Sequence, residues 1–444
     1  MRKFPNALVI MIGFIIFASI LTYVIPQGTY ERKIDPESGI TKVVPDSYQV
    51  IDAAPVSFFD TFIAIPEGII ERADLIALIL LIGGCFYVID RTGALKEGIE
   101  YLTSVLNGKE ELALILVALV FLTGGALNGL QEEIIAMTPV LLYLSARLGY
   151  DKFVALAISY GAAILGASFS PINPFAVVIA QNETELPFLS GALFRLVVLL
   201  IAFAVFMFMV IRYANKNRVE KSVADNASSV KIRKSSVLIL DLVALSFIIL
   251  IYGMLQLNWG FNEMTAEFFI LGIVVGLIGK LGINGTSEAY LDGFKELVFA
   301  AMIVGLASSI SIILKKGMVI DSIVYGLFLP MQYLPKSLSA LSMMASQALL
   351  HIPVPSYSGQ AILTMPILAP LSDLIGLSRQ VCVLAYQYAA VMMDLLTPTN
   401  GSLMAVIAIA GISFNKWFKF ALKLTLVIMG VGALAIIAAI YMGI

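Results

Sequence analysis

The chain carries one short polar pattern twice, each time inside an otherwise apolar stretch. Each copy has a hydroxyl residue, then Pro, any residue and Asn, running from Ser170 to Asn173 and from Thr397 to Asn400. Proline removes a backbone donor and clashes one helical turn back, so each copy should break a helix and free carbonyl groups. Freed carbonyls bind small cations, and the exposed half-helix N-termini attract carboxylates. We expect the two breaks to form one binding site; two proline kinks that only pack helices are the alternative.

Two polar segments precede the breaks and differ in charge. Segment 123–133 is Gly-rich and ends in Gln-Glu-Glu, whereas 351–360 has no acidic residue and contains His351, the only histidine. Carboxylates at membrane depth are costly and usually functional, although a shallow tip would leave them solvated. His351 could titrate near neutral pH, but a lone histidine near a helix end is more often simply hydrogen-bonded. The candidate substrate-binding residues are Asn128, Gln131, Glu132, Glu133, Ser170, Asn173, Ser356, Ser358, Gln360, Thr397, Thr399 and Asn400.

Two acidic residues are candidates for a coupling ion or proton, namely Asp394 and Glu132. Asp394 lies deep in an apolar run, three residues before Thr397, where a structural hydrogen bond to a hydroxyl neighbour is an equal alternative. Neither polar segment and neither break contains Lys or Arg. This favours a substrate with a positive group beside the acids, and an amino acid also has a carboxylate for a half-helix N-terminus. A dicarboxylate would have to rely on helix ends, amides and co-bound cations.

The composition is that of a polytopic membrane protein. Of 444 residues, 60% are hydrophobic and 13% charged, and apolar runs recur from end to end. The net charge of −2 and the lack of a basic stripe give no sign of nucleic-acid binding. Cys85 and Cys382 form no metal or disulfide pattern. One histidine and no metal-ligand cluster argue against an enzyme, and two local breaks do not make the continuous polar stripe of a channel.

Apolar lengths predict an all-α fold with about nine full spans. The apolar run 112–122 is too short to span, so 110–148 should be a re-entrant hairpin, and 337–375 a second one. Segments 57–71, 94–107 and 318–330 look interfacial, and 26–56 is a polar external loop. The expected spans are 5–25, 73–90, 152–181 with the first break, 190–212, 237–256, 263–281, 297–314, 379–412 with the second break, and 417–441.

A shift of 227 positions aligns the two halves without a gap. It brings Pro139 onto Pro366, Gly149 onto Gly376 and Pro171 onto Pro398. Matches of this kind in one register indicate an internal duplication. The basic linker 213–236 should be cytoplasmic, like the N-terminus. The two broken helices are then antiparallel, which predicts an inverted repeat. Its parts are 1–212, a linker and linking span at 213–256, and 257–444.

These motifs resemble those of the ion transporter superfamily. Within it, the chain is most similar to the anaerobic four-carbon-dicarboxylate carrier-like branch, which includes a group of basic amino-acid (arginine/ornithine) antiporters. The segments that carry the resemblance are Gly124 to Glu133, Ser168 to Asn173, Pro353 to Gln360 and Leu396 to Gly401. The resemblance implies a homodimer in a bacterial plasma (inner) membrane, an elevator mechanism, and sites at the hairpin tips and broken helices. Sodium-coupled members carry Ser-Asn-Thr where this chain has Ser-Pro-Ile-Asn and Thr-Pro-Thr-Asn.

The expected function is secondary active transport of amino acids, with basic ones in arginine/ornithine-type exchange as the first choice. A cation-coupled C4-dicarboxylate or other small-carboxylate carrier is the alternative. A channel or a membrane enzyme is less expected. No cofactor is expected beyond a sodium ion or a proton, and sodium coupling, proton coupling and exchange all stay open.

Overall fold

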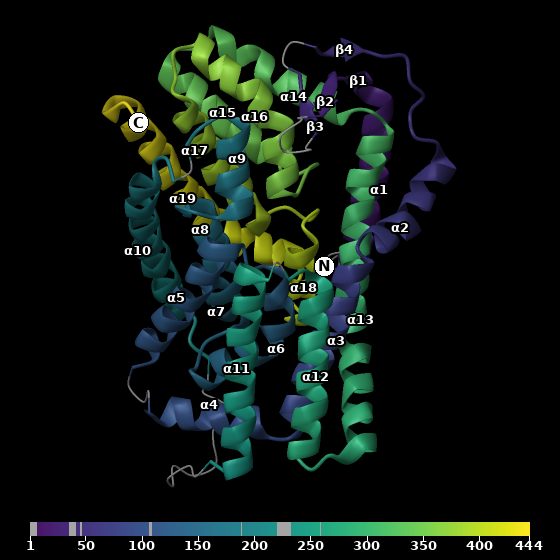
Figure 1. The fold of residues 1–444 in the computed structure, drawn as a ribbon, viewed down its shortest axis with the longest axis vertical. Helices are drawn as coiled ribbons and strands as arrows, with labels where there is room; N and C mark the ends of the chain where they lie inside the picture. The colour runs from purple at the N-terminus through teal and green to yellow at the C-terminus, as the bar shows by residue number, and fades with distance from the viewer. Residues whose placement is uncertain are drawn as a thin grey trace.

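The computed structural model describes residues 7–34, 41–44, 47–105, 109–187, 189–219, 232–257 and 259–444. The described chain is helical except for two short ribbons of paired strands. Figure 1 shows the long helices running roughly side by side along the longest axis of the molecule. Seven helical segments within the described residues are long and apolar enough to cross a membrane: α3 (Ala73–Arg91), α5 (Glu110–Asn128), the broken segment Lys152–Glu183, α10 (Ala192–Lys216), α12 (Phe261–Ile278), α13 (Gly282–Lys316) and α19 (Phe414–Met442). The chain is therefore an all-helical polytopic membrane protein.

One expectation about length is wrong. The run 112–122 looked too short to span, but α5 continues through the small residues after it and has 19 residues, enough to cross by length and composition. It ends where Gly129 adopts a left-handed conformation, with φ 70°. The chain then turns into α6 (Glu132–Arg147). The three remaining expected spans, 5–25, 237–256 and 379–412, correspond to α1 (Ala7–Val24), α11 (Lys234–Gln256) and the broken segment from Arg379 to Ile409.

On one side of the molecule, α13 is the central helix. It is 35 residues long and packs along α3, α2 (Phe58–Glu71) and α1. A glycine pair allows the close approach of two of these helices, because a Cβ at Gly293 would lie 2.8 Å from the Cα of Gly84. Arg72 is the residue between α2 and α3, so a charged side chain lies where these two helices meet. We call these helices, with α12, the α13 bundle.

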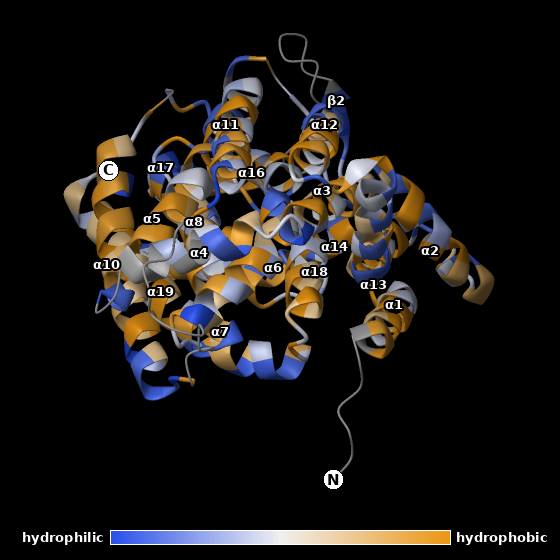
Figure 2. Ribbon diagram, turned by 90° about the horizontal axis from the view of Figure 1, so that it is seen from below, coloured by the Kyte–Doolittle hydropathy of each residue, from blue (hydrophilic) through white to orange (hydrophobic). Residues whose placement is uncertain are grey.

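The other side contains the two broken segments and the helices packed around them. Here α5 packs on α8 (Ala162–Phe169), and α15 (Lys336–Leu350) packs on α17 (Arg379–Ala390). The α5–α8 contact is tight, since a Cβ at Gly125 would lie 2.0 Å from the carbonyl oxygen of Ala163. The helices α10 and α19 cover this side, and Figure 2 shows hydrophobic residues along both, as on α12 and α1. Such apolar faces suit contact with lipid.

The two ends of the molecule carry different polar structures. The expected external loop forms antiparallel ribbons, β1 (Gly28–Thr29) with β4 (Gln49–Val50) and β2 (Arg32–Ile34) with β3 (Thr41–Val43). Asp321 in α14 (Ile320–Phe328) fixes them by accepting from the Tyr30 amide at 2.9 Å and from Arg32 at 2.8 Å. At the opposite end, α4 (Ala94–Val105) lies across the helices (Figure 1). Its Glu97 pairs with Arg233, which lies in the basic linker.

Candidate functional site

The first break is fastened to the end of α5. It follows α7 (Lys152–Leu156), a π-helical turn (Ala157–Gly161) and α8, and leaves 170–173 outside any helix. The Asn173 side chain caps the next turn by accepting from the amides of Phe175 and Ala176 at 2.9 and 2.8 Å. Its Nδ2 donates to the Gly125 carbonyl at 2.9 Å. Ser170 donates to the Ala126 carbonyl at 2.6 Å.

The second break uses the same device. It lies between α17, which continues into a 3₁₀ turn (Val391–Leu395), and α18 (Gly401–Ile409). Asn400 caps α18 by accepting from the Leu403 amide at 2.8 Å. Thr399 donates to the Ile352 carbonyl at 2.6 Å. Ile352 and Gly125 occupy equivalent positions in the 227-residue register, so each break is fastened to the same point of the helix pair before it.

The Asp394 carboxylate is the centre of the polar network between the breaks. It is 1% exposed, accepts three hydrogen bonds and contacts a ring nitrogen of His351. His351 Nε2 lies 2.8 Å and Asn400 Nδ2 lies 2.6 Å from Oδ1. The Tyr357 hydroxyl and Gln131 Nε2 both donate to Oδ2, the latter at 3.0 Å. Three donors and one ring nitrogen around this buried oxygen pair hold the Asp394 side chain in place.

This network joins the two polar tips directly. Gln131, at the α5–α6 turn, donates to the Tyr357 hydroxyl of α16 (Tyr357–Leu374) and accepts from Asn400 at 3.2 Å. Tyr160, in the π-helical turn, donates toward Gln131 at 3.3 Å and toward Asn400 at 3.2 Å. Both tips and both broken segments therefore contribute side chains to one buried cluster.

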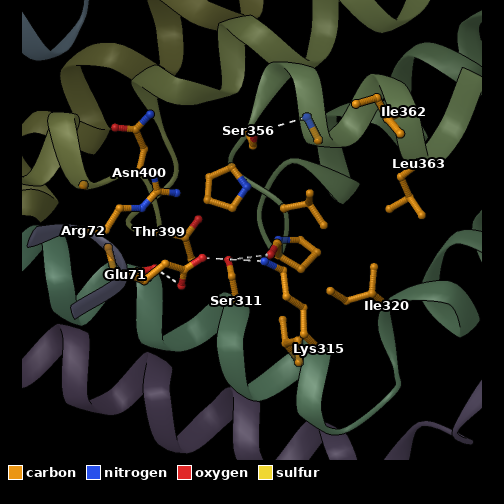
Figure 3. A pocket seen from close by; sticks show the side chains of 18 of the residues that line it. Glu71, Arg72, Ser311, Lys315, Ile320, Ser356, Ile362, Leu363, Thr399 and Asn400 are labelled. Atoms are coloured by element: carbon orange, nitrogen blue, oxygen red, sulfur yellow. Dashed lines mark hydrogen bonds and ion pairs between the residues drawn. The ribbon is translucent and has the colours of Figure 1, made fainter. Parts of the chain in front are cut away.

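A large cavity of about 570 Å³ lies between the α13 bundle and the second tip. Its deep wall includes Glu132, Asn400 and the first residues of α18, Gly401 and Ser402. Figure 3 shows Thr399 and Asn400 on one side of the space, Ile362 and Leu363 on the other, and Ser311 and Lys315 rising from α13. The wall from the ribbon side includes Gly28, Arg32 and Asp321. The cavity thus reaches from the ribbon end of the molecule down to the breaks.

A second cavity, of about 340 Å³, lies beside the tips and we call it the tip cavity. Gln131, Glu133, Tyr357, Ser358 and Asp394 line it. Some residues line both cavities: Arg72, Glu132, Pro355, Ser356 and Asn400. They therefore lie between the two spaces.

The large cavity contains positive charges that the breaks and tips lack. Arg72 and Lys315 line it from the α13 bundle, and Arg32 lines it from the ribbons. Glu71 lies beside them, 3.9 Å from Lys315 and hydrogen-bonded to Ser308 at 2.9 Å. The cavity therefore contains positive side chains, although the tips themselves contain no Lys or Arg. Packing of distant segments brings these side chains to the site, and the local patterns around the breaks contain no signal for them.

The structure separates the expected site residues into two groups. Cavities are lined by Gln131, Glu132, Glu133, Ser356, Ser358, Thr399, Asn400 and Asp394. The others among the described side chains line neither of these cavities. Ser170, Asn173 and Thr397 hold the breaks, and Gln360 bonds to His351 and Gln347. Asn128 ends α5, and its side chain lies outside the described residues.

Three aromatic residues of the network gave little or no sequence signal. Tyr160 lies in an unbroken apolar stretch, and Tyr357 was only one of several polar tip residues. His351 was expected to be hydrogen-bonded, and it is, but its partner is the Asp394 carboxylate. Its being the only histidine was the one signal that could have marked it.

A family model fits almost the whole chain. The model of the C4-dicarboxylate anaerobic carriers (DcuC) matches residues 4–441. This chain belongs to that family. It is a multi-pass membrane carrier of a small molecule.

Two relatives match the chain over 99% of its length. One is an uncharacterized protein of Haemophilus influenzae, 28% identical and matched over 97% of its own length. The other is named putative basic amino acid antiporter YfcC of Escherichia coli, 29% identical and also matched over 97%. The family is described by C4-dicarboxylates, whereas this relative is named for basic amino acids, so the two comparisons indicate different substrate classes.

Two solved transporters show a weaker likeness. YdaH of Alcanivorax borkumensis has a TM-score of 0.45 at 14% identity, over 99% of both chains. MtrF of Neisseria gonorrhoeae has a TM-score of 0.43 at 14% identity, over 99% of this chain and 96% of its own. A likeness at this level adds no argument about this site.

Proposed function

We propose that this chain is a secondary active transporter of basic amino acids, working by exchange or cation coupling. The observation that carries the proposal is the deep wall of the large cavity, where Glu132 lies beside the capped N-terminus of α18. An amino-acid carboxylate suits the amides at Gly401 and Ser402, since helix N-termini favour anions. The cationic side chain of the substrate suits Glu132, with Glu71 farther along the same wall.

A C4-dicarboxylate carrier is the second candidate, and two observations favour it. Arg72 and Lys315 line the same cavity, and each can bind a carboxylate. The family is described by this substrate class. A dicarboxylate would place its second acid near Glu132, however, where two like charges repel unless one is protonated.

The test is transport by the purified protein in liposomes. Vesicles loaded with unlabelled arginine, ornithine, citrulline or succinate are given external radiolabelled arginine or succinate. We expect arginine to enter vesicles loaded with arginine or ornithine, by counterflow. Succinate transport without arginine transport would overturn the proposal and establish the second candidate.

We further propose that the chain is an inverted repeat of 1–212 and 257–444, joined through 213–256, with two re-entrant hairpins. The helix bounds support this. Shifted by 227 positions, α5 and α6 become 337–355 and 359–374, close to α15 and α16. The same shift carries α10 to 419–443, over α19 (Phe414–Met442).

The mechanism we propose is an elevator. The α13 bundle would stay fixed while the hairpins and broken helices move along it, carrying the substrate. The large cavity lies between these two groups of helices, which supports the division. A homodimer joined through the fixed bundles, a bacterial inner-membrane location and a cytoplasmic N-terminus belong to the same proposal.

A further inference from the structure

The hydrogen bonds of His351 define its proton content. Its Nε2 lies 2.8 Å from Asp394 Oδ1, and its Nδ1 lies 2.7 Å from Gln360 Oε1. The orientation of the Gln360 amide is fixed, because its Nε2 donates to the Gln347 backbone carbonyl at 2.8 Å. Both ring nitrogens therefore face oxygen acceptors. A neutral imidazole has only one N–H and cannot satisfy both.

Two arrangements satisfy this geometry, and they contain the same number of protons. In one, imidazolium donates to Asp394 carboxylate and to Gln360. In the other, neutral His351 donates to Gln360 while protonated Asp394 donates to the ring. Either way the pair as a whole is neutral, with one proton more than a neutral imidazole beside a carboxylate.

Burial makes this extra proton important. His351 is 0% and Asp394 1% exposed. Removing the proton leaves one net negative charge on a buried pair, and it sets a nitrogen lone pair against an oxygen. One of the two ring hydrogen bonds, to Asp394 or to Gln360, is then lost unless water or a cation enters. The tip cavity supplies a route for the proton, since Asp394 lines it.

We infer that the His351–Asp394 pair binds and releases one proton in each transport cycle, and that this proton holds the second tip against the second break. This inference rests on the proposed transport function and names its coupling ion. Loading forms one N–H or O–H bond on the pair, and unloading returns the proton to water in the tip cavity. No other bond changes.

The geometry links the proton to the substrate space. His351 ends α15 and Asp394 lies in the 3₁₀ turn before the second break. The residues between α15 and α16, Pro353 to Ser356, form a wall of the large cavity. When a hydrogen bond of His351 is lost, this wall is held to the break only by the bonds from Tyr357 to Asp394 and from Thr399 to the Ile352 carbonyl. The proton thereby sets how firmly the wall of the substrate space is held.

Other titratable groups face Asp394 from each neighbouring element. They are Glu132 in α6, Tyr160 in the π-helical turn, Tyr357 in α16 and Tyr386 in α17. Arg72 interacts with Glu132 in turn. None of the tyrosines has reason to ionise in a buried site. Glu132 is the one group whose charge competes directly, so it must be varied in the same experiment.

The first measurement observes the proton without any substrate. Because His351 is the only histidine, protein labelled with ¹⁵N-histidine and purified through a histidine-free tag gives one imidazole signal in lipid bilayers. We expect one transition in this signal, from the proton-loaded to the unloaded ring, when the pH is varied. In Asp394→Asn the transition should change, and in Glu132→Gln it should remain. A ring that does not titrate, or that titrates identically in Asp394→Asn, would overturn the inference.

The second measurement follows the proton during transport. Liposomes containing a pH-sensitive dye and the protein are given arginine, so that proton and arginine fluxes are recorded together. We expect coupled fluxes in the native chain. In His351→Gln, net proton movement should fall to that of empty liposomes, while arginine exchange at equal pH continues at a lower rate. Glu267→Gln is the control, because Glu267 bonds to Ser246 in the α11–α12 region and lines neither cavity.

The outcomes separate this inference from the proposed function. Absence of arginine counterflow with a normal His351 titration would remove the substrate proposal alone. Arginine counterflow with unchanged proton movement in His351→Gln would remove the coupling inference alone.

Discussion

Two adjacent acidic residues at the first tip, Glu132 and Glu133, have different surroundings in the structure. Glu132 lines both cavities, whereas Glu133 lines only the tip cavity. One carboxylate oxygen of Glu133 is buried and has no hydrogen-bond partner among the described residues. If the start of the helix shifted by one residue, Glu132 and Glu133 would exchange these environments. The sequence therefore predicts an acidic residue at the tip but does not predict which of the two faces the large cavity.

Glu132→Gln should weaken binding of arginine more than binding of citrulline, its uncharged analogue. Losing one charged hydrogen bond costs about 1.5–3 kcal/mol, so the arginine Kd should rise roughly tenfold or more. Isothermal titration on the purified protein measures both ligands. Glu267→Gln serves as the control carboxylate, and equal effects of Glu132→Gln on arginine and citrulline would contradict the role of Glu132.

At the scale of the helices, the breaks were predictable and their roles were not. Pro171 and Pro398 interrupt the helices where the sequence indicated, because proline has the same local effect in any fold. The partners of each break come from segments distant in sequence. Asn173 therefore bonds to backbone, whereas the equivalent Asn400 bonds to Asp394 and lines both cavities.

Asn173→Ala and Asn400→Ala should consequently have different effects. Losing the Asn173 cap and its bond to Gly125 should lower the free energy of unfolding by about 1–2 kcal/mol, with little change in the arginine KM. Losing Asn400 should raise the KM as well. Thermal unfolding in detergent and initial uptake rates measure the two effects, and a large rise in KM for Asn173→Ala alone would reverse the assignment.

For the molecule as a whole, the lengths of the apolar runs and the positions of the basic residues predicted more of the structure than the residue types at the tips did. The apolar spans and the 227-residue register follow from periodic local patterns, and α13 and α10 appear where spans were expected. The paired strands, the 19-residue α5 and the cationic wall of Arg72 and Lys315 depend on long-range packing. Neither tip contains Lys or Arg, but Arg72 and Lys315 reach the cavity from the α13 bundle on its other side.

The large cavity should be accessible from outside the cell in this conformation. Arg32 and Asp321 line its ribbon end, and the basic linker lies at the opposite end of the molecule. A cysteine at Ile362, in its wall, should react with a membrane-impermeant maleimide added outside and be protected by arginine. A cysteine at Asn217, beside the linker, should react only in inverted vesicles. The native Cys85 and Cys382 are 0% exposed and should stay silent; labelling of both sites from one side would refute this orientation.

In the proposed repeat, the His351–Asp394 pair occurs in the second half alone. Shifted back by 227 positions, Asp394 falls on Ala167 and His351 on Gly124, so the first half has no counterpart of the pair. One proton per chain sets the electrical character of the cycle. Exchange of a proton for arginine moves no net charge, whereas exchange of a proton for citrulline moves one, and each charge is worth about 2.3 kcal/mol per 100 mV. The membrane voltage would thus change the driving force for citrulline exchange but not that for arginine exchange.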